Sequence, residues 1–252
     1  MSAALRVAVV GARGRLGSFA CDMLRGAPDF ELVAHWDSRD DWRSLAPRCG
    51  AQVALEATRA GLGFEHARAL LDSGLCVVVA TSGVTAEENV DLDRQAQALG
   101  LGGIVVPNFS VGSWLLQRFA AEAARWFEGA EVVESHHVRK HDAPSGTALE
   151  TARRMNLERE RAGLAPFRPT KPEQAARGQL ADGVPIHSLR LPGFYAHQEV
   201  VLGSAGELLR LSHDMHGPEA FGPGIRAALR YAAGARGVAR GVEVALDHAS
   251  RG

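Results

Sequence analysis

LRVAVVGARGRLG, residues 5–17, is the stretch that decides the fold of the first part of this chain. Its apolar, β-branched beginning, Leu5 to Val10, predicts a strand, and Ser18 to Arg25 predicts a helix. Three glycines stand between them in a GxxGxxG pattern: Gly11, Gly14 and Gly17. A strand, a glycine turn and a helix in this order are typical of a dinucleotide-binding site, where the pyrophosphate meets the helix N-terminus.

Each glycine has an expected task in such a turn. Gly11 would make the sharp turn, Gly14 would let the backbone approach the pyrophosphate, and Gly17 would let the helix pack on the sheet. The spacing differs by one residue from the commoner GxGxxG form. A second interpretation therefore stays open, in which the glycines only pack a helix against a sheet.

A second predicted strand, Glu31 to Trp36, ends at Asp37. Dinucleotide-binding folds place an acidic residue about twenty positions after the glycine turn, where it binds the adenosine ribose hydroxyls, and Asp37 is our candidate for it. Arg39 follows two residues later and is able to meet a 2′-phosphate. The residues leave both NADH and NADPH open as the cofactor.

Strands and helices continue to alternate after Asp37. We predict strands over Gln52–Leu55, Leu75–Ala80 and Gly103–Val106, with helices over Gly63–Ser73 and Ala86–Leu99. Such alternation predicts an α/β fold with a Rossmann-type parallel sheet. Ligands bind at the carboxyl ends of such strands, so two turns should face the cofactor: Ala80, Thr81 and Ser82 in one, and Val106, Pro107, Asn108 and Phe109 in the other.

The pattern changes after Asn108, which predicts two domains, residues 1–107 with 217–252 and residues 108–216. The second should be an α+β domain with a mixed or antiparallel sheet. We predict a helix over Val111–Phe127, a strand over Glu131–His137 and a polar surface excursion over Arg161–Asp182.

Three later runs predict an antiparallel meander: Ile186–Leu191, Phe194–Gly203 and Leu208–His213. An antiparallel sheet of this kind has an open face that needs a cover, so we expect a homo-oligomer formed through it. The helix predicted over Glu219–Ala233 should return to the first domain.

The richest chemistry lies in ESHHVRKHDAPSGTALETA, residues 134–152. His136 and His137, followed by Lys140, offer a group that titrates near neutral pH beside a cation, which suits proton donation to an anionic substrate. The competing interpretation is two ordinary strand histidines and a solvated lysine. We favour the functional interpretation because titratable groups gather at active sites.

The same segment contains a predicted turn and helix start, Ala143 to Thr147, with Thr147 and Glu150 spaced as a capping box. Backbone amides around Ser145, Gly146 and Thr147 should point outward, and Gly146 would let a ligand come close to the chain. We therefore expect these residues to bind a substrate carboxylate.

Composition excludes several functions. The chain has 252 residues with a formal net charge of -1, so no overall field attracts nucleic acid. No apolar run approaches the roughly 20 residues of a membrane span, and we expect a cytoplasmic protein. The three cysteines, Cys21, Cys49 and Cys76, are odd in number and lack a CxxC pair, so we expect no disulfides. The histidines lack the spacing of metal ligands, so we expect no metal.

Four segments carry a resemblance to a known family: VAVVGARGRLG at the start, PNFSVG at 107–112, ESHHVRKHDAPSGTAL at 134–149, and VPIHSLRLPGFYAHQEVVLG at 184–203. The chain resembles the 4-hydroxy-tetrahydrodipicolinate reductases, also called dihydrodipicolinate reductases, over nearly its whole length. The HHxxKxDAPSGTA pattern is the most specific of these signals.

The resemblance implies a reductase of lysine and diaminopimelate biosynthesis that transfers hydride from NADH or NADPH to C4 of a cyclic dicarboxylate, with loss of water. It implies that His136 is the acid/base, that Lys140 donates a proton, and that His137, Gly146 and Thr147 contact a carboxylate. It also implies a homotetramer. It implies cofactor contacts at Asp37, on the two later turns, and on the glycine turn formed by Gly11, Ala12, Arg13, Gly14, Arg15 and Leu16.

The chain departs from the family pattern near the cofactor. Ala80-Thr81-Ser82-Gly83 replaces the usual GTTG, and Glu56-Ala57-Thr58 replaces an aspartate-phenylalanine-threonine strand end. Two alternatives therefore remain at this point. One is a nucleotide-binding relative with impaired catalysis, and the other is a reductase of a related cyclic imine dicarboxylate.

Overall fold

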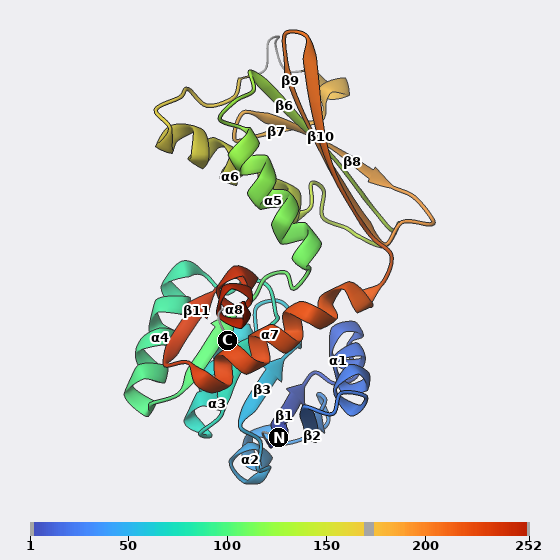
Figure 1. Cartoon of the computed structure of the whole chain (residues 1–252). Coiled ribbons are helices and arrows are strands. Elements are labelled where there is room, and N and C mark those ends of the chain that lie inside the picture. Colours follow the sequence, from blue (N-terminus) through green and yellow to red (C-terminus); the bar gives the residue numbers. More distant parts are fainter. Residues whose placement is uncertain (1–2, 169–173, 251–252) are drawn as a thin grey trace. The chain divides into compact units, whose positions relative to one another are not determined.

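The computed structural model describes residues 3–168 and 174–250 of the chain. Contacts divide it into two compact units, Met1–Val111 with Phe221–Gly252 and Gly112–Ala220. Each unit is built on its own sheet (Figure 1).

The first unit contains a six-stranded sheet in which every paired strand is parallel, in the order β11-β5-β4-β3-β1-β2. Its strands are β1 Leu5–Val10, β2 Phe30–Trp36, β3 Val53–Glu56, β4 Cys76–Val79, β5 Gly102–Val105 and β11 Gly237–Arg240. Parallel strands covered on both faces read as continuous apolar runs, and β3 and β4 are buried at every position. The predicted parallel Rossmann-type sheet is confirmed.

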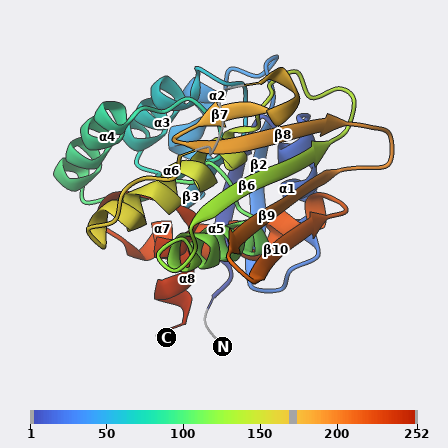
Figure 2. The same cartoon turned by 90° about the horizontal axis from the view of Figure 1, so that it is seen from above.

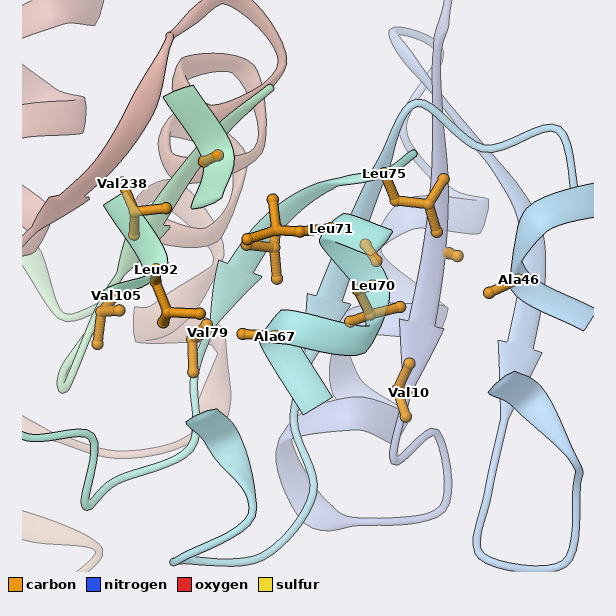
Figure 3. Packing of buried hydrophobic residues seen from close by; sticks show 14 of the residues in the cluster. Val10, Ala46, Ala67, Leu70, Leu71, Leu75, Val79, Leu92, Val105 and Val238 are labelled. Atoms are coloured by element: carbon orange, nitrogen blue, oxygen red, sulfur yellow. The ribbon is translucent and has the colours of Figure 1, made fainter. Parts of the chain in front are cut away.

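Helices lie on both faces of this sheet: α1 Arg15–Arg25, α2 Trp42–Leu45, α3 Gly63–Asp72, α4 Ala86–Leu99, α7 Gly222–Gly234 and α8 Val242–Ala249. Figure 3 shows Leu70 and Leu71 of α3 among the strand residues Val10, Val79 and Val105, all of them buried. This packing fixes the carboxyl ends of the strands, where the predicted cofactor turns begin.

The second unit contains a mixed five-stranded sheet in the order β10-β9-β6-β8-β7. Its strands are β6 Gly129–His136, β7 Gln179–Ala181, β8 Val184–Arg190, β9 Ala196–Ser204 and β10 Glu207–Met215. β6 and β8 run parallel, and the other neighbours are antiparallel. The predicted α+β class with a mixed sheet is confirmed.

The predicted meander is wrong in its pairing, because β6 lies between β8 and β9. The link between β8 and β9, residues 191–195, spans about 16 Å when extended. Crossing one strand needs about 10 Å, so the link is long enough to pass over the end of β6. The Pro192-Gly193 turn signal does not distinguish a hairpin from this crossover.

Helices α5 Val111–Ala123 and α6 Gly146–Arg161 cover one face of this sheet, as both Figure 1 and Figure 2 show. The strand residues on that face are apolar and pack against both helices: Val132, Ile186, Val200 and Leu202 against Leu116, Ala120, Ala148, Ala152 and Met155. The helix-covered face of the sheet is therefore the core of the second unit.

Helix α5 ends four residues before the predicted Phe127, and Arg159 of α6 accounts for the end. Its Nη1 donates to the carbonyl oxygens of Ala124 and Phe127, at 2.7 and 2.8 Å, so a side chain replaces the next helical turn. The predicted polar excursion follows α6, and Phe167 anchors it by packing under Arg159, 4.2 Å from guanidinium carbon to ring centroid. Part of that excursion, residues 169–173, lies outside the described residues.

Candidate active site

The first candidate site is the glycine turn of the first unit. Gly11 has φ +89°, and a Cβ there would overlap the carbonyl oxygen of Ala57. A Cβ on Gly17 would overlap the carbonyl oxygen of Gly11. The packing interpretation of these two glycines therefore holds. It does not compete with ligand binding, because α1 begins after Gly14 without a capping side chain and its first amides are available to an anion.

Asp37 directly follows the end of β2 and is held by its neighbours. Its Oδ2 lies 2.5 Å from Arg13 Nε, and its Oδ1 accepts the backbone N–H of Arg39 at 2.8 Å. The backbone N–H of Asp37 donates to Asp40 Oδ2 at 2.8 Å. A pocket of about 450 Å³ opens here, lined by Ala12, Arg13, Ser18, Cys21, Asp22, Arg25, His35, Asp37, Arg39 and Asp40. Balanced arginines and aspartates suit the hydroxyls or the phosphate of a ribose.

The two later turns extend from β4 and β5 with mixed exposure. Thr81, Val106 and Phe109 are buried, whereas Ser82 and Pro107 are exposed and Ala80 and Asn108 are partly buried. The backbone of Phe109 also packs against Gly224, where a Cβ would overlap the Phe109 carbonyl oxygen. Only part of each turn is therefore open to a ligand.

A buried carboxylate underlies the first of these turns and has no role in the sequence-based prediction. Glu56, fully buried at the end of β3, accepts the Thr58 backbone N–H at 3.1 Å and approaches His66 Nδ1 at 3.2 Å. The Thr58 hydroxyl also donates to it. Burial alone would raise the pKa of Glu56, but the hydrogen bonds from His66 and Thr58 outweigh burial and lower it.

A second candidate site lies at the end of β6 in the second unit. Glu134, fully buried, and His136 are two residues apart and so project from the same face of the strand. His136 Nδ1 lies 2.5 Å from Glu134 Oε2. The same face carries Val132 and the apolar core, so Glu134 is a carboxylate at the edge of a hydrophobic interior.

Arg190 at the end of β8 compensates this buried charge. Its Nη1 donates to Glu134 Oε2 at 3.0 Å and its Nη2 to Oε1 at 2.8 Å. The backbone N–H of Ser145 adds a bond to Oε1 at 3.2 Å. Burial would raise the pKa of Glu134, but hydrogen bonds from His136, Arg190 and Ser188 outweigh burial and lower it to about 2.

Lys140 joins this cluster through Asp142. Its Nζ donates to both carboxylate oxygens of Asp142, at 2.8 and 2.7 Å, and Arg190 Nη2 donates to the Asp142 carbonyl oxygen at 2.6 Å. The hydrogen bond from Lys140 lowers the pKa of Asp142. His137, just beyond the end of β6, accepts the backbone N–H of Lys140 at 3.1 Å through its carbonyl oxygen.

The helix start differs from the predicted capping box. Ser145, not Thr147, is the N-cap, because its hydroxyl accepts the backbone N–H of Ala148 at 3.2 Å. Glu150 instead pairs with arginines of its own helix. The Ser145 amide does not point outward as predicted, since it donates to Glu134. Thr147 and Glu150 have the S/T-x-x-E spacing, but the helix begins earlier, at Gly146, and Ser145 takes the N-cap position without a capping box because the residue three positions later is Ala148.

Gly146 and Thr147 form the first turn of α6. A Cβ on Gly146 would have no neighbour within 4 Å, so open space lies in front of it. A chain of hydrogen bonds holds this turn to the sheet, from Gln198 Nε2 to Thr151 Oγ1 at 2.7 Å and from Thr151 Oγ1 to the Thr147 carbonyl oxygen at 2.8 Å. The helix start is thus fixed from below and open in front.

The structure brings several predicted residues of the second unit together. His136 and Ser145 meet at Glu134, and Lys140 joins them through Asp142 and Arg190. The prediction missed Glu134, Arg190 and Asp142. The i, i+2 spacing of two polar residues on a strand that also carries Val132 was the available signal for Glu134.

Among the described residues, no group of three or more histidine, cysteine or acidic side chains is placed to hold a metal. In the same part of the chain, no helix combines the length and the apolar character needed to cross a membrane.

Comparisons with known proteins agree with this architecture. The family model described as dihydrodipicolinate reductase, N-terminus, matches residues 5–109, and the model described as dihydrodipicolinate reductase, C-terminus, matches residues 112–244. The chain belongs to the dihydrodipicolinate reductase family. The resemblance read from the sequence is confirmed.

Individual members of the dihydrodipicolinate reductase family match nearly the whole chain. The 4-hydroxy-tetrahydrodipicolinate reductase of Streptomyces coelicolor is 44% identical over 247 residues, which cover 96% of this chain and 98% of the relative. That of Clavibacter michiganensis is 41% identical over 242 residues, covering 96% and 86%. The structure of dipicolinate-bound dihydrodipicolinate reductase from Paenisporosarcina sp. TG-14 has a TM-score of 0.83 and 32% identity, covering 96% of this chain and 99% of that one.

More distant structures share only the fold. An amine dehydrogenase from Mycobacterium smegmatis has a TM-score of 0.59 with 14% identity. The two-unit architecture is therefore wider than the dihydrodipicolinate reductase family, and the residues around Glu134 and Gly146 must carry the argument for a particular reaction.

Proposed function

We propose that this chain is an NAD(P)H-dependent reductase that converts 4-hydroxy-tetrahydrodipicolinate to tetrahydrodipicolinate in lysine and diaminopimelate biosynthesis. The observation that carries the proposal lies in the second unit, where β6 ends next to the start of α6. There His136 and Lys140 lie beside the helix start, which is open at Gly146. The relatives named above, which match nearly the whole chain, support the same reaction.

The two units divide the work. The first, with its uncapped helix α1 and the pocket at Asp37, binds the dinucleotide. The second binds the substrate. In terms of the predicted domains, residues 1–107 with 217–252 bind the dinucleotide and residues 108–216 bind the substrate. When bound, the reduced nicotinamide supplies the hydride for C4 of the substrate.

The residues of the second unit supply protons and charge. The reaction takes up one hydride and one proton and releases the C4 hydroxyl as water, so an acid is needed near the ring. His136 acts as the acid/base and Lys140 as a proton donor. A carboxylate of the substrate binds His137 and the helix start at Ser145, Gly146 and Thr147. Ser145 acts as the cap that holds this start in place.

Both NADH and NADPH fit the residues at Asp37. The carboxylate suits free ribose hydroxyls, whereas Arg13 and Arg39 suit a 2′-phosphate. Because Arg13 balances the charge of Asp37, a 2′-phosphate does not meet an isolated anion. We therefore propose a reductase that accepts either cofactor, bound also by the later turns at Ala80, Thr81, Ser82, Val106, Pro107, Asn108 and Phe109.

We also propose a cytoplasmic homotetramer. The face of the second sheet that α5 and α6 do not cover carries partly exposed Val133 and Val201 and exposed Leu208, which favour a second copy as the cover. The three cysteines are free thiols, which suits a reducing compartment. Sedimentation or light scattering of the purified protein tests the assembly.

The activity test generates the unstable substrate from pyruvate and aspartate semialdehyde with the preceding synthase and follows nicotinamide absorbance. We expect oxidation of NADH or NADPH that depends on this chain. Absence of oxidation at high enzyme concentration contradicts the proposal. A non-catalytic relative would bind a nicotinamide cofactor without tightening by dipicolinate, and a reductase of another cyclic imine would prefer that compound in side-by-side assays. No observation favours either alternative.

A further inference from the structure

We propose that Glu134 is a positioning residue that keeps the imidazole hydrogen of His136 on Nδ1, so that Nε2 is the nitrogen that exchanges protons with the substrate. The part of this inference that concerns catalysis rests on the proposed reductase function. The part that concerns the hydrogen of His136 stands on the geometry of the second unit alone.

The bond between the two side chains is short and its polarity is fixed. His136 Nδ1 and Glu134 Oε2 are 2.5 Å apart, a separation that requires a hydrogen between them. With a pKa of about 2, Glu134 is ionised at any working pH and acts only as an acceptor. The hydrogen must therefore belong to Nδ1.

The other neighbours of Glu134 hold the carboxylate in place. Arg190 donates to both oxygens and the Ser145 amide donates to one of them, so these polar partners of the carboxylate are donors, as His136 is. The Leu191 amide also donates to the His136 carbonyl oxygen at 3.2 Å, which fixes the backbone under the ring. The imidazole thus has a rigid acceptor on its Nδ1 side.

Charges on the neighbouring elements do not offer a second acceptor to that nitrogen. The guanidinium of Arg190 is a donor, Asp142 binds Lys140 with its carboxylate, and Ser188 belongs to the set that donates to Glu134. On β9, His197 stands opposite Ser135 and pairs with Asp214, which places that pair on the other face of the sheet. Among the residues that the structure describes, Glu134 is the acceptor placed on Nδ1 of this ring.

Because Arg190 pairs with Glu134, the main effect of Glu134 on His136 is on the position of the imidazole hydrogen and not on the net charge around the ring. Its guanidinium balances the carboxylate, so Glu134 and Arg190 are together neutral before His136 gains a proton. The remaining effect of Glu134 is to orient the imidazole ring of His136 and to select its tautomer. An acceptor that orients a histidine and selects its tautomer is a recurrent device in catalytic sites.

The decisive measurement is the position of the hydrogen in the unmodified protein. Long-range ¹⁵N–¹H correlation spectra of ¹⁵N-histidine protein at about pH 9, where imidazoles are neutral, distinguish the two tautomers. The His136 signals are identified by their absence in His136→Gln. We expect hydrogen on Nδ1 and a bare Nε2. Hydrogen on Nε2 would overturn the proposal without any mutation of Glu134.

Glu134→Gln tests the cause. Arg190 and Ser145 demand the single remaining oxygen, so the new amide NH₂ should face His136 and donate to Nδ1. We expect the hydrogen to move to Nε2 and kcat to fall about 10²-fold with an unchanged KM for NADH. Glu134→Asp keeps an acceptor and should restore hydrogen on Nδ1 together with part of kcat.

Glu56→Gln is the matched control, because Glu56 is an equally buried carboxylate beside a histidine Nδ1 in the other unit. It should change the spectrum of His66 and leave that of His136 as it was. If Glu134→Gln does not fold, the unmodified protein and Glu134→Asp decide. Full kcat in a folded Glu134→Gln would refute the catalytic part. Spectra as expected in a protein without reductase activity would refute the proposed function and leave the tautomer assignment standing.

Discussion

Arg13 Nε lies 2.5 Å from Asp37 Oδ2, so the carboxylate expected to meet the ribose already carries a cation. We predict that Arg13→Ala weakens NADPH binding relative to NADH by about 10-fold, equivalent to about 1.4 kcal/mol, because the 2′-phosphate then faces an unbalanced aspartate. Asp37→Asn should change the ratio in the opposite direction. Calorimetric titration with both cofactors checks the pair, and equal losses for NADH and NADPH in Arg13→Ala would contradict this role.

Gly146→Ala should separate ligand binding from folding. Alanine forms helices better than glycine, and its methyl group would enter empty space, so the variant should be as stable as the parent or up to about 1 kcal/mol more stable. We expect KM for the substrate to rise about 10-fold or more, because the methyl group occupies the place of the carboxylate. Gly129→Ala, at another open glycine, is the control and should leave KM unchanged.

Glu134 should make stability depend on acid. Its folded pKa of about 2 lies below its ordinary value of 4.5, so its contribution is full above about pH 4.5 and is lost as the pH falls through 2. At about 1.4 kcal/mol per pKa unit, the contribution is about 3 kcal/mol.

Urea unfolding of the parent and of Glu134→Gln at a series of pH values tests this expectation. The difference between them should be largest at neutral pH and shrink toward pH 2. A difference that stays constant with pH would mean that the pKa of Glu134 is not lowered in the folded state. Glu150→Gln, at a partly exposed ion pair, should show a much smaller difference.

Lys140 and Asp142 should matter for turnover and not for folding. Their ion pair leaves 61% of the Asp142 side chain exposed, and exposed pairs contribute about 1 kcal/mol or less. Lys140→Met should therefore melt near the parent and lose about 10²-fold in kcat. Asp142→Asn, which keeps the ammonium, should lose much less. Equal losses in both variants would indicate that the pair acts as a unit.

The parallel sheet of the first unit was predictable because its signals are local. A buried strand such as β4 is visible in the sequence as a continuous apolar run. Gly11 indicates a sharp turn, because its backbone has φ +89°, a conformation that few other residues adopt. The helix starts were harder. Ser145 and Thr147 are both acceptable caps, and only the three-dimensional turn selects Ser145.

The partners of the candidate site were beyond local patterns. Glu134 and Arg190 are 56 residues apart in the chain, and their meeting depends on the parallel pairing of β6 with β8. The sequence runs that form β8 and β9 suggested that these two strands pair with each other. A strand that inserts between them leaves no mark in either run, so the buried ion pair was missed for the same reason as the sheet order.

The central place of β6 in the second sheet determines when this unit can fold during synthesis. During synthesis Glu134 emerges 56 residues before Arg190, and a carboxylate buried without a partner costs several kcal/mol. β6 should therefore stay unpaired on the ribosome until β8 and β9 have emerged and can flank it. A nascent chain that ends before β8 would leave both edges of β6 without a pairing strand and would need protection from aggregation. Strands β8 and β9, which are made after the proton-handling segment, are therefore the ones that allow this segment to fold.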